Sequence, residues 1–166
     1  FDCYLEEIHG GQMIAYVGHK EEYDSTDRLK KYEKAEKRNK ANSKKIYLDF
    51  AKKIEKLKIK NINFIKKSLS SHKLIYGMGA PVKGNTLLNY FGFKSSEIKK
   101  LLEINDLRKG LYAPGSHIPV ELEKDQNVQP DIFYVLAWNF KKEILNKNKY
   151  LIKKGVKFYF PIDVKL

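Results

Sequence analysis

The sequence has one cysteine, few arginines and no long apolar run, and each shortage excludes a class of protein. Cys3 alone cannot form an internal disulfide or a thiolate metal cluster, so we expect a reducing cytoplasm and no metal site. No apolar run approaches the roughly 20 residues that a membrane-spanning helix needs. The first residues, Phe1 to Tyr4, lack the basic and apolar regions of a signal peptide. We therefore expect a soluble chain without a membrane partner.

The shortage of arginine bears on nucleic-acid binding. The net charge of +13 attracts phosphate, but only Arg28, Arg38 and Arg108 among 33 basic residues are arginines. Arginine dominates where phosphates or base edges are held bidentately. The lysines of residues 28–67 are spread among Glu33, Glu36, Asp49 and Glu55, as on a solvated helix face. We expect no nucleic-acid partner; a basic nucleic-acid binder is the alternative, and its affinity would fall steeply with salt.

The 166 residues and an apolar fraction of 42% suit one domain with an appendage. Residues 1–19 predict two strands, 4–8 and 12–17, joined by the Gly10-Gly11 pair of a tight hairpin. A two-stranded hairpin is not stable alone. We therefore expect residues 1–19 to be the end of a domain that is otherwise absent from the chain.

Residues 20–70 predict a helical linker followed by a long helix. Residues 25–42 are so polar that they indicate an exposed helix. Apolar side chains then recur every three or four residues up to residue 67, which predicts one amphipathic helix. Asn42 and Ser43 are both candidates to cap the junction.

Residues 71–166 alternate between strand and helix patterns. Strands are expected at 73–76, around 98–104, at 118–120, 131–137 and 156–160, with helices from the glycine-rich loop to residue 90 and at 140–154. Residues 131–137 are apolar almost throughout, which indicates a central strand buried on both faces. The pattern predicts an α/β, Rossmann-like three-layer α-β-α domain with a mostly parallel sheet.

The glycine-rich loop, Gly77-Met-Gly-Ala-Pro-Val-Lys-Gly-Asn-Thr86, lies where the first strand meets a helix. Free backbone N–H groups and the helix dipole favour a phosphate there. Gly77 and Gly79 allow close approach of the backbone and Lys83 adds a charge. The spacing fits neither the Walker A motif nor the dinucleotide fingerprint. A phosphate cradle and a tight turn needed only for packing are both open interpretations.

Four further residues are candidates for ligand contact, and each has a structural alternative. Glu103 lies 26 residues after Gly77, near the end of the second expected strand, where an acidic residue binds ribose in Rossmann sites, or it is an exposed surface glutamate. Trp138 and Asn139 follow the central strand on the side where ligands bind. Alternatively, Trp138 is a core residue and Asn139 is a helix N-cap. His117 is a ligand contact or a loop histidine.

His9 stands before two glycines of the hairpin, where a side chain is presented to a neighbouring cavity. Its ordinary pKa near 6.5 suits a general base at neutral pH. A structural histidine in the hairpin is the alternative.

Several segments together resemble the sugar C-methyltransferases that act on nucleotide-linked deoxysugars. The match runs in order along nearly the whole chain. It covers His9-Gly-Gly11, Gly77 to Tyr90, Lys109 to Pro119, Pro130-Asp131 and Ala137 to Phe140.

The resemblance implies a three-part enzyme with a zinc-binding domain, a domain for S-adenosylmethionine and a Rossmann-like C-terminal domain. This chain would be the last domain plus the tail of the second, with S-adenosylmethionine and zinc held mainly upstream. His9 would be the base that removes a proton beside a keto group. Together with the positions argued above, we expect these substrate-binding residues: Gly77, Gly79, Lys83, Gly84, Asn85, Glu103, His117, Trp138 and Asn139.

The sequence departs from the family pattern at three positions. Gln12 and Ile14 stand where similar sequences have serine and arginine, and Pro81 replaces a small polar residue. We expect the charged groups of the substrate to be held differently. A non-catalytic nucleotide-binding or nucleotide-sugar-binding module is the alternative function.

Overall fold

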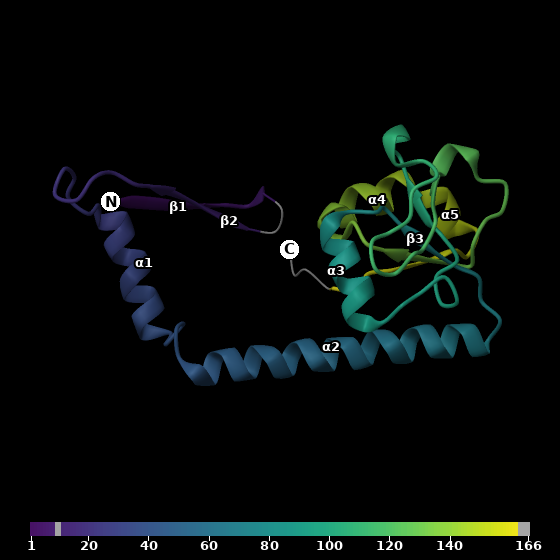
Figure 1. Ribbon diagram of the computed structural model, residues 1–166, viewed down its shortest axis with the longest axis horizontal. Helices are drawn as coiled ribbons and strands as arrows, with labels where there is room; N and C mark the ends of the chain where they lie inside the picture. Colours follow the sequence, from purple (N-terminus) through teal and green to yellow (C-terminus); the bar gives the residue numbers. More distant parts are fainter. Residues whose placement is uncertain (9–10, 163–166) are drawn as a thin grey trace. The chain divides into compact units, whose positions relative to one another are not determined.

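A computed structural model describes residues 1–8 and 11–162. It consists of two compact units, Phe1–Glu55 and Lys56–Leu166. The boundary falls inside a long helix (Figure 1). Within the part of the chain that is described, no helix is both long enough and apolar enough to cross a bilayer.

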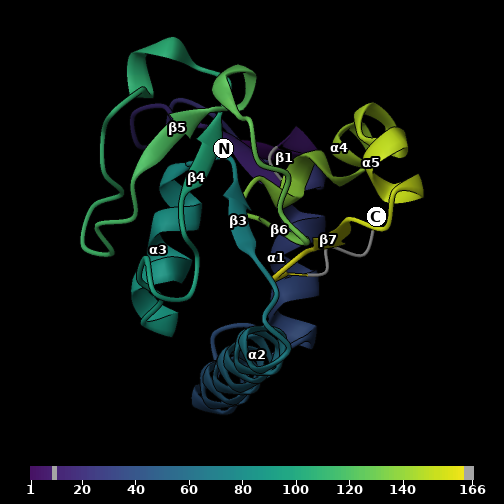
Figure 2. The same ribbon diagram turned by 90° about the vertical axis from the view of Figure 1, so that its right-hand side faces the viewer.

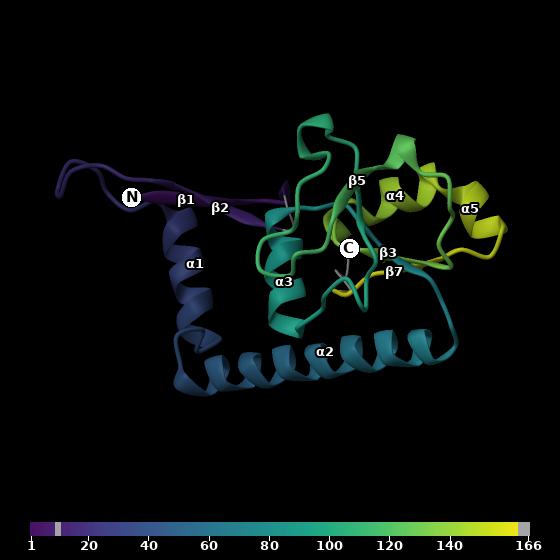
Figure 3. The same cartoon turned by 45° about the vertical axis from the view of Figure 1, so that its right-hand side comes forward.

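The first unit contains the predicted hairpin and a polar helix (Figure 3). Strands β1 (Asp2–Glu6) and β2 (Gln12–Tyr16) pair antiparallel, so the hairpin is confirmed. Helix α1 (Asp27–Arg38) begins after Thr26, whose hydroxyl accepts a 3.2 Å bond from the N–H of Leu29. The same hydroxyl donates to Asp2 at 2.6 Å, which ties α1 to β1.

Helix α2 (Lys44–Ser70) confirms the long amphipathic helix. Of the two candidate caps, the Ser43 hydroxyl accepts a 3.4 Å bond from the N–H of Ile46. The part of α2 in the second unit packs against the core through Ile65, with Leu57, Phe64 and others partly buried beside it. The apolar face of this part of α2 is therefore buried against the core, as its spacing predicts.

The second unit is built on a five-stranded sheet in the order β5-β4-β3-β6-β7 (Figure 2). Its strands are β3 (Ile75–Met78), β4 (Leu101–Glu103), β5 (Val120–Leu122), β6 (Ile132–Val135) and β7 (Lys157–Tyr159). All neighbouring pairs are parallel. The strand order reverses direction at β3, so the carboxyl ends of β3 and β6 form a topological switch point, where open α/β sheets bind ligands.

Helices cover both faces of this sheet, which confirms the Rossmann-like three-layer architecture. On one face, Leu88 and Phe91 of α3 (Val82–Phe91) and Ile65 of α2 pack in the same cluster as Ile75 and Tyr134. On the other face, Leu151 of α5 (Lys149–Lys153) packs with Phe133 and other sheet residues, and Ile144 of α4 (Lys141–Lys147) packs beside them.

The single helix predicted for residues 140–154 is wrong. The chain forms a 3-10 turn at Trp138–Phe140, then α4 and α5 with Asn148 between them. The side-chain amide of Asn148 donates to the carbonyl of Ile144 at 2.8 Å. Asparagine side chains compete in this way with the helical hydrogen-bond ladder.

The third strand of the domain also differs from the prediction, because it begins at Val120 instead of residue 118. The carbonyl of Ile118 accepts a bond from the N–H of Ala113 within the preceding loop, and Pro119 has no N–H to donate. From β5 the chain crosses back to β6 with only a 3-10 turn, Glu123–Asp125, and coil.

Candidate functional site

The glycine-rich loop connects the carboxyl end of β3 to the amino end of α3. Gly79 has φ of +80°, a left-handed conformation that favours glycine. Pro81 takes the N-cap position of α3 and makes no side-chain capping bond. The first-turn N–H groups of α3 therefore lie at the carboxyl edge of the sheet without a side-chain cap, where the helix dipole favours an anion.

The glycines of the loop also have a packing role. A β-carbon on Gly84 would lie 2.8 Å from the β-carbon of Leu136, and one on Gly77 would overlap the side chain of Leu101. A β-carbon on Gly79 would lie 3.1 Å from that of Ala137. These close contacts confirm that the glycines are needed for packing in a tight turn. Whether the loop also contacts a phosphate stays a prediction.

Glu103 is buried at the carboxyl end of β4, with a relative exposure of 9%. Its Oε2 accepts from the N–H of Ala80 at 3.1 Å and from Nη1 of Arg108 at 2.9 Å. Its Oε1 accepts from the N–H groups of Ile104 at 2.9 Å and Asn105 at 3.4 Å. The interpretation as an exposed surface glutamate is therefore wrong.

Arg108 closes this arrangement, because its Nη1 also donates to the carbonyl of Ala80 at 2.8 Å. Glu103 and Arg108 thus hold both the N–H and the carbonyl of one residue in the glycine-rich loop. Burial raises the pKa of Glu103, but the three backbone N–H donors and Arg108 together lower it below its ordinary value. The carboxylate is ionised at neutral pH, and a ribose hydroxyl would have to displace one of its four donors.

Trp138 and Asn139 follow β6 at the same edge of the sheet. Trp138 is 9% exposed, which confirms the core interpretation. Asn139 is half-buried inside the 3-10 turn, and α4 begins after Phe140 without a side-chain cap. The N-cap interpretation of Asn139 is therefore wrong.

The first turns of α3 carry two further predicted residues. Lys83 is exposed there, and Asn85 is half-buried. The Oδ1 atom of Asn85 is buried and accepts no hydrogen bond from the residues that the structure describes. An unpaired buried acceptor costs about 1–3 kcal/mol, so a donor on a bound molecule would be favourable at this point.

His117 lies apart from the predicted site residues at the carboxyl edge of the sheet. Its loop is held by Asn89, which donates to the carbonyl of Pro114 at 2.9 Å, and by Lys94, which donates to that of Gly115 at 2.6 Å. Asn89 is in the last turn of α3, and a crossover helix runs antiparallel to its strands. The exposed His117 therefore lies toward the opposite, amino edge of the sheet.

His9, the predicted catalytic base, lies outside the described residues. The structure places the strands on either side of it, β1 ending at Glu6 and β2 beginning at Gln12.

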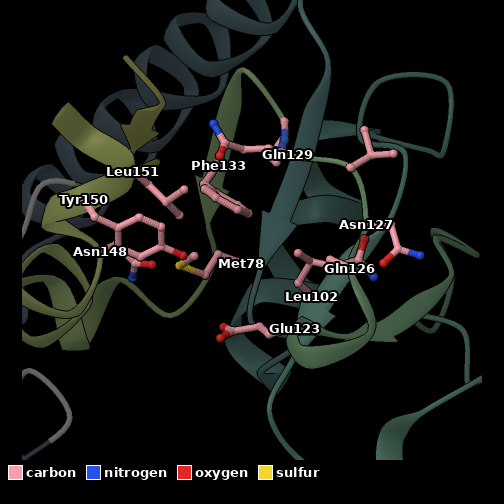
Figure 4. A pocket seen from close by; sticks show the side chains of 12 residues that line it. Met78, Leu102, Glu123, Gln126, Asn127, Gln129, Phe133, Asn148, Tyr150 and Leu151 are labelled. Atoms are coloured by element: carbon pink, nitrogen blue, oxygen red, sulfur yellow. The ribbon is translucent and has the colours of Figure 1, made fainter. Parts of the chain in front are cut away.

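A cavity of about 320 Å³ lies on the sheet face that α4 and α5 partly cover (Figure 4). We call it the crossover cavity, since one wall is the connection from β5 to β6, residues 123–130, and the other is Asn148 to Leu151. Its floor contains Met78, Leu102 and Phe133. A second hollow, of about 380 Å³, is lined by Glu103, Lys124 and Lys147 among others, and shares Glu123 with the first.

Sequence reasoning missed Arg108 and the crossover cavity. Arg108 had a weak signal, because it is the only arginine after residue 38 and follows Glu103 by five positions. The cavity had none, since its lining comes from four separate segments of the chain.

Comparison with known proteins identifies the family of this chain. Residues 7–163 match the family model described as C-methyltransferase C-terminal domain. The chain is also 27% identical over 168 residues to the C-methyltransferase NovU of Streptomyces niveus. That alignment covers 97% of this chain and 39% of the relative, so the chain spans less than half the length of the relative. Because the family model spans nearly all of the sequence, the chain belongs to the family of C-methyltransferase C-terminal domains.

Proposed function

We propose that this protein is the C-terminal portion of an S-adenosylmethionine-dependent C-methyltransferase that acts on a nucleotide-linked keto-deoxysugar. The match of residues 7–163 to the C-methyltransferase C-terminal domain carries the proposal. In it, the described chain supplies the nucleotide side of the site, in a cytoplasmic enzyme whose other domains lie upstream.

The carboxyl edge of the sheet supports a site for the diphosphate of such a substrate. The amino end of α3 has no side-chain cap, and the exposed Lys83 in its first turn adds a positive charge. Backbone N–H groups and the helix dipole at such an end favour a phosphate. Asn85 offers an acceptor to a substrate hydroxyl. Trp138 and Asn139 border the same edge.

The same residues do not fit S-adenosylmethionine. A Rossmann site would hold its ribose with the acidic residue at the end of the second strand of the domain, but the carboxylate of Glu103 already accepts four donors. The positive end of α3 and Lys83 also disfavour a sulfonium cation. We therefore assign the methyl donor, and the zinc implied by the family resemblance, to upstream domains.

The step assigned to this chain is a proton transfer. His9 accepts the proton from the carbon beside the keto group, and the C–H electron pair remains on the sugar as an enolate. The carbon of that enolate is then the nucleophile for methyl transfer. Proton transfer to a positioned side chain typically contributes about 10²–10⁴ in rate.

The experiment rejoins this chain to its upstream region and measures methyl transfer to keto-deoxysugar nucleotides. We expect methyl transfer by the joined protein, and a rate about 10²-fold or more lower in its His9→Ala variant. A matched control is His72→Ala, which removes an exposed histidine at the end of α2 and should leave the rate unchanged. Undiminished turnover in His9→Ala would remove His9 from the mechanism.

The alternative function is tested on the chain by itself. A non-catalytic binding module should bind sugar nucleotides without its upstream region, whereas a domain that completes its site with that region should bind them more weakly alone. Tight binding by the chain together with no transfer by the joined protein would favour the module.

A further inference from the structure

The crossover cavity exists because the sheet is incompletely covered. In a three-layer α/β fold the connection between two halves of the sheet is usually helical. Here the connection from β5 to β6 has only the 3-10 turn Glu123–Asp125 and coil. Helices α4 and α5 pack on the same face through Leu151 and Ile144. The gap between them and the connection leaves the cavity of about 320 Å³.

The floor of the crossover cavity is apolar and aromatic. Met78, Leu102 and Phe133 rise from three neighbouring strands and are each at most 6% exposed. Tyr150 stands on the α5 side and is 59% exposed, and in the view of Figure 4 the hydroxyl end of its ring points toward Met78. Aromatic faces and a thioether are suited to the flat face of a ring.

Amide side chains surround this floor. Gln126, Asn127 and Gln129 come from the connection, and Asn148 comes from the junction of α4 and α5. The NH₂ group of Gln126 donates to Glu121 at 2.8 Å, and that of Asn148 donates to the carbonyl of Ile144 at 2.8 Å. Both amides are thereby fixed, and their oxygens are acceptors. The exposed Asn127 and Gln129 add both donors and acceptors.

The charge of the cavity argues against an anion. Its lining, among the residues with described positions, includes no lysine or arginine, and its acidic residue is Glu123. Glu123 is paired with Lys147 at 3.3 Å, so the described lining offers a phosphate or sugar acid no cation to balance its charge. The features together select a flat, uncharged ring with hydrogen-bonding groups on its edge.

The cavity adjoins the phosphate-favouring end of α3. Met78 is the last residue of β3 and lines the cavity, and the next residue, Gly79, begins the glycine-rich loop. A molecule with a neutral ring at one end and a diphosphate at the other would place its ring in the cavity and its diphosphate at the amino end of α3. At about 320 Å³ the cavity is at the small end of ligand sites, which suits a base and part of its ribose.

From this arrangement we infer that the crossover cavity binds the nucleobase of a nucleoside diphosphate, with the base against Phe133 and Tyr150 and its edge on the amides. The inference rests on the proposed function for the identity of the whole ligand. The cavity itself selects a neutral heterocycle, and purine and pyrimidine share that chemistry.

The test uses nucleosides that carry no phosphate, so that the glycine-rich loop does not contribute. The full chain, labelled with ¹⁵N, is titrated to millimolar concentrations of thymidine, uridine, adenosine or guanosine and followed by NMR. We expect shifts of the backbone amides of Asn127, Gln129 and Tyr150 with at least one of them. The preferred nucleoside identifies the base.

Two variants test the location. Tyr150→Ala removes the exposed ring and should weaken nucleoside binding about 10-fold or more, the range found for base stacking. Its matched control is Tyr47→Ala, a tyrosine of the same 59% exposure in the first unit, which should bind as the unaltered chain does. Asn127→Trp should block the cavity and abolish the shifts while leaving the amide spectrum folded.

The outcomes separate this inference from the proposed function. If inorganic pyrophosphate shifts the amides of Gly79 and Lys83 but no nucleoside shifts the cavity amides, the inference is overturned and the proposed function stands. Equal binding of nucleoside by Tyr150→Ala and the unaltered chain also overturns it. Nucleoside binding in the cavity with no methyl transfer by the rejoined protein supports the inference and defeats the proposed function.

Discussion

The hydroxyl of Tyr134 donates a 2.6 Å hydrogen bond to Oδ1 of Asn61, and both side chains are completely buried. The amide nitrogen of Asn61 donates in turn to the carbonyls of Leu57 at 2.8 Å and Pro161 at 3.2 Å. Asn61 thus connects α2, the interior strand β6 and the segment after β7. A buried amide is tolerated here because these bonds use its oxygen and its nitrogen.

Tyr134→Phe is expected to lower the free energy of unfolding by about 1–3 kcal/mol, because the oxygen of Asn61 loses its donor while it stays buried. Urea unfolding followed by circular dichroism measures the change.

Tyr159→Phe is the matched control. The Tyr159 hydroxyl is also buried, but it has no hydrogen-bond partner within residues 1–8 and 11–162, and its ring stacks on Phe64 with centroids 3.6 Å apart. Removing this hydroxyl keeps the ring contact and should leave stability unchanged or raised. Equal losses in both variants would contradict the role assigned to Asn61.

Gly84 should tolerate no side chain. In Gly84→Ala the new methyl would lie 2.8 Å from the β-carbon of Leu136, which is fixed to the sheet backbone and cannot swing away. Alanine gains helix propensity over glycine by about 1 kcal/mol, but overpacking typically costs about 1–3 kcal/mol. We therefore expect a net loss, measured as a lower urea midpoint.

The control for Gly84→Ala is Val82→Ala, in the same turn but 79% exposed. It should be neutral or slightly stabilising, because alanine is the better helix former. A Gly84→Ala protein as stable as Val82→Ala would show that α3 moves freely away from the sheet.

The order of strands and helices was predictable because apolar spacing reports burial directly. Residues 131–137 are apolar almost throughout, and β6 within them is fully buried. The same rule predicted α2. Competition between side chains and the backbone for hydrogen bonds was not predictable from apolar spacing. The break at Asn148 depends on a side-chain bond to Ile144, which spacing cannot reveal.

The candidate site was predictable only in part, for a topological reason. Gly79 and Trp138 follow parallel strands and Glu103 ends one, so the three share one edge of the sheet. His117 precedes a strand instead, within a loop anchored to the end of α3, and it lies toward the other edge. The partners of Glu103 were also hidden, because three of its donors are backbone N–H groups that any sequence supplies.

Glu103→Gln is expected to lower the free energy of unfolding at neutral pH by about 1–2 kcal/mol. The glutamine NH₂ group would face donors that now meet a carboxylate oxygen, so at least one stays unpaired. The glycine-rich loop should loosen as well, seen as faster hydrogen exchange of the Ala80 amide. Glu143→Gln, at an exposed position of α4, is the control and should change stability by less than about 0.5 kcal/mol.

The pH dependence provides a second test of Glu103. Because its pKa is lowered from the ordinary value of 4.5, its contribution is complete above that value and is lost as the pH falls through the folded-state pKa. The stability difference between the unaltered chain and Glu103→Gln should therefore shrink on acidification. A difference that stays constant would indicate that the charge of Glu103 does not matter.

In the first unit, Asp2 should titrate far below a normal aspartate. A hydrogen bond from Arg28, and then one from Thr26, lower the pKa of Asp2 from 3.8 to about 2. Arg28→Gln should raise the pKa of Asp2 toward 3.8, and Thr26→Ala should raise it less, because the bond from Arg28 is the larger cause. NMR titration of the Asp2 carboxyl carbon measures both shifts.

The sign of this effect on stability follows from the lowered pKa. The contact between α1 and β1 is strengthened by ionised Asp2 above pH 3.8 and loses that contribution as the pH falls through about 2. Lys45→Gln removes an exposed ion pair with Asp49 on α2 instead and should leave the pKa of Asp2 unchanged. A titration of Asp2 near 3.8 in the unaltered chain would mean that Arg28 does not hold it in solution, and that α1 is joined to the hairpin by other contacts.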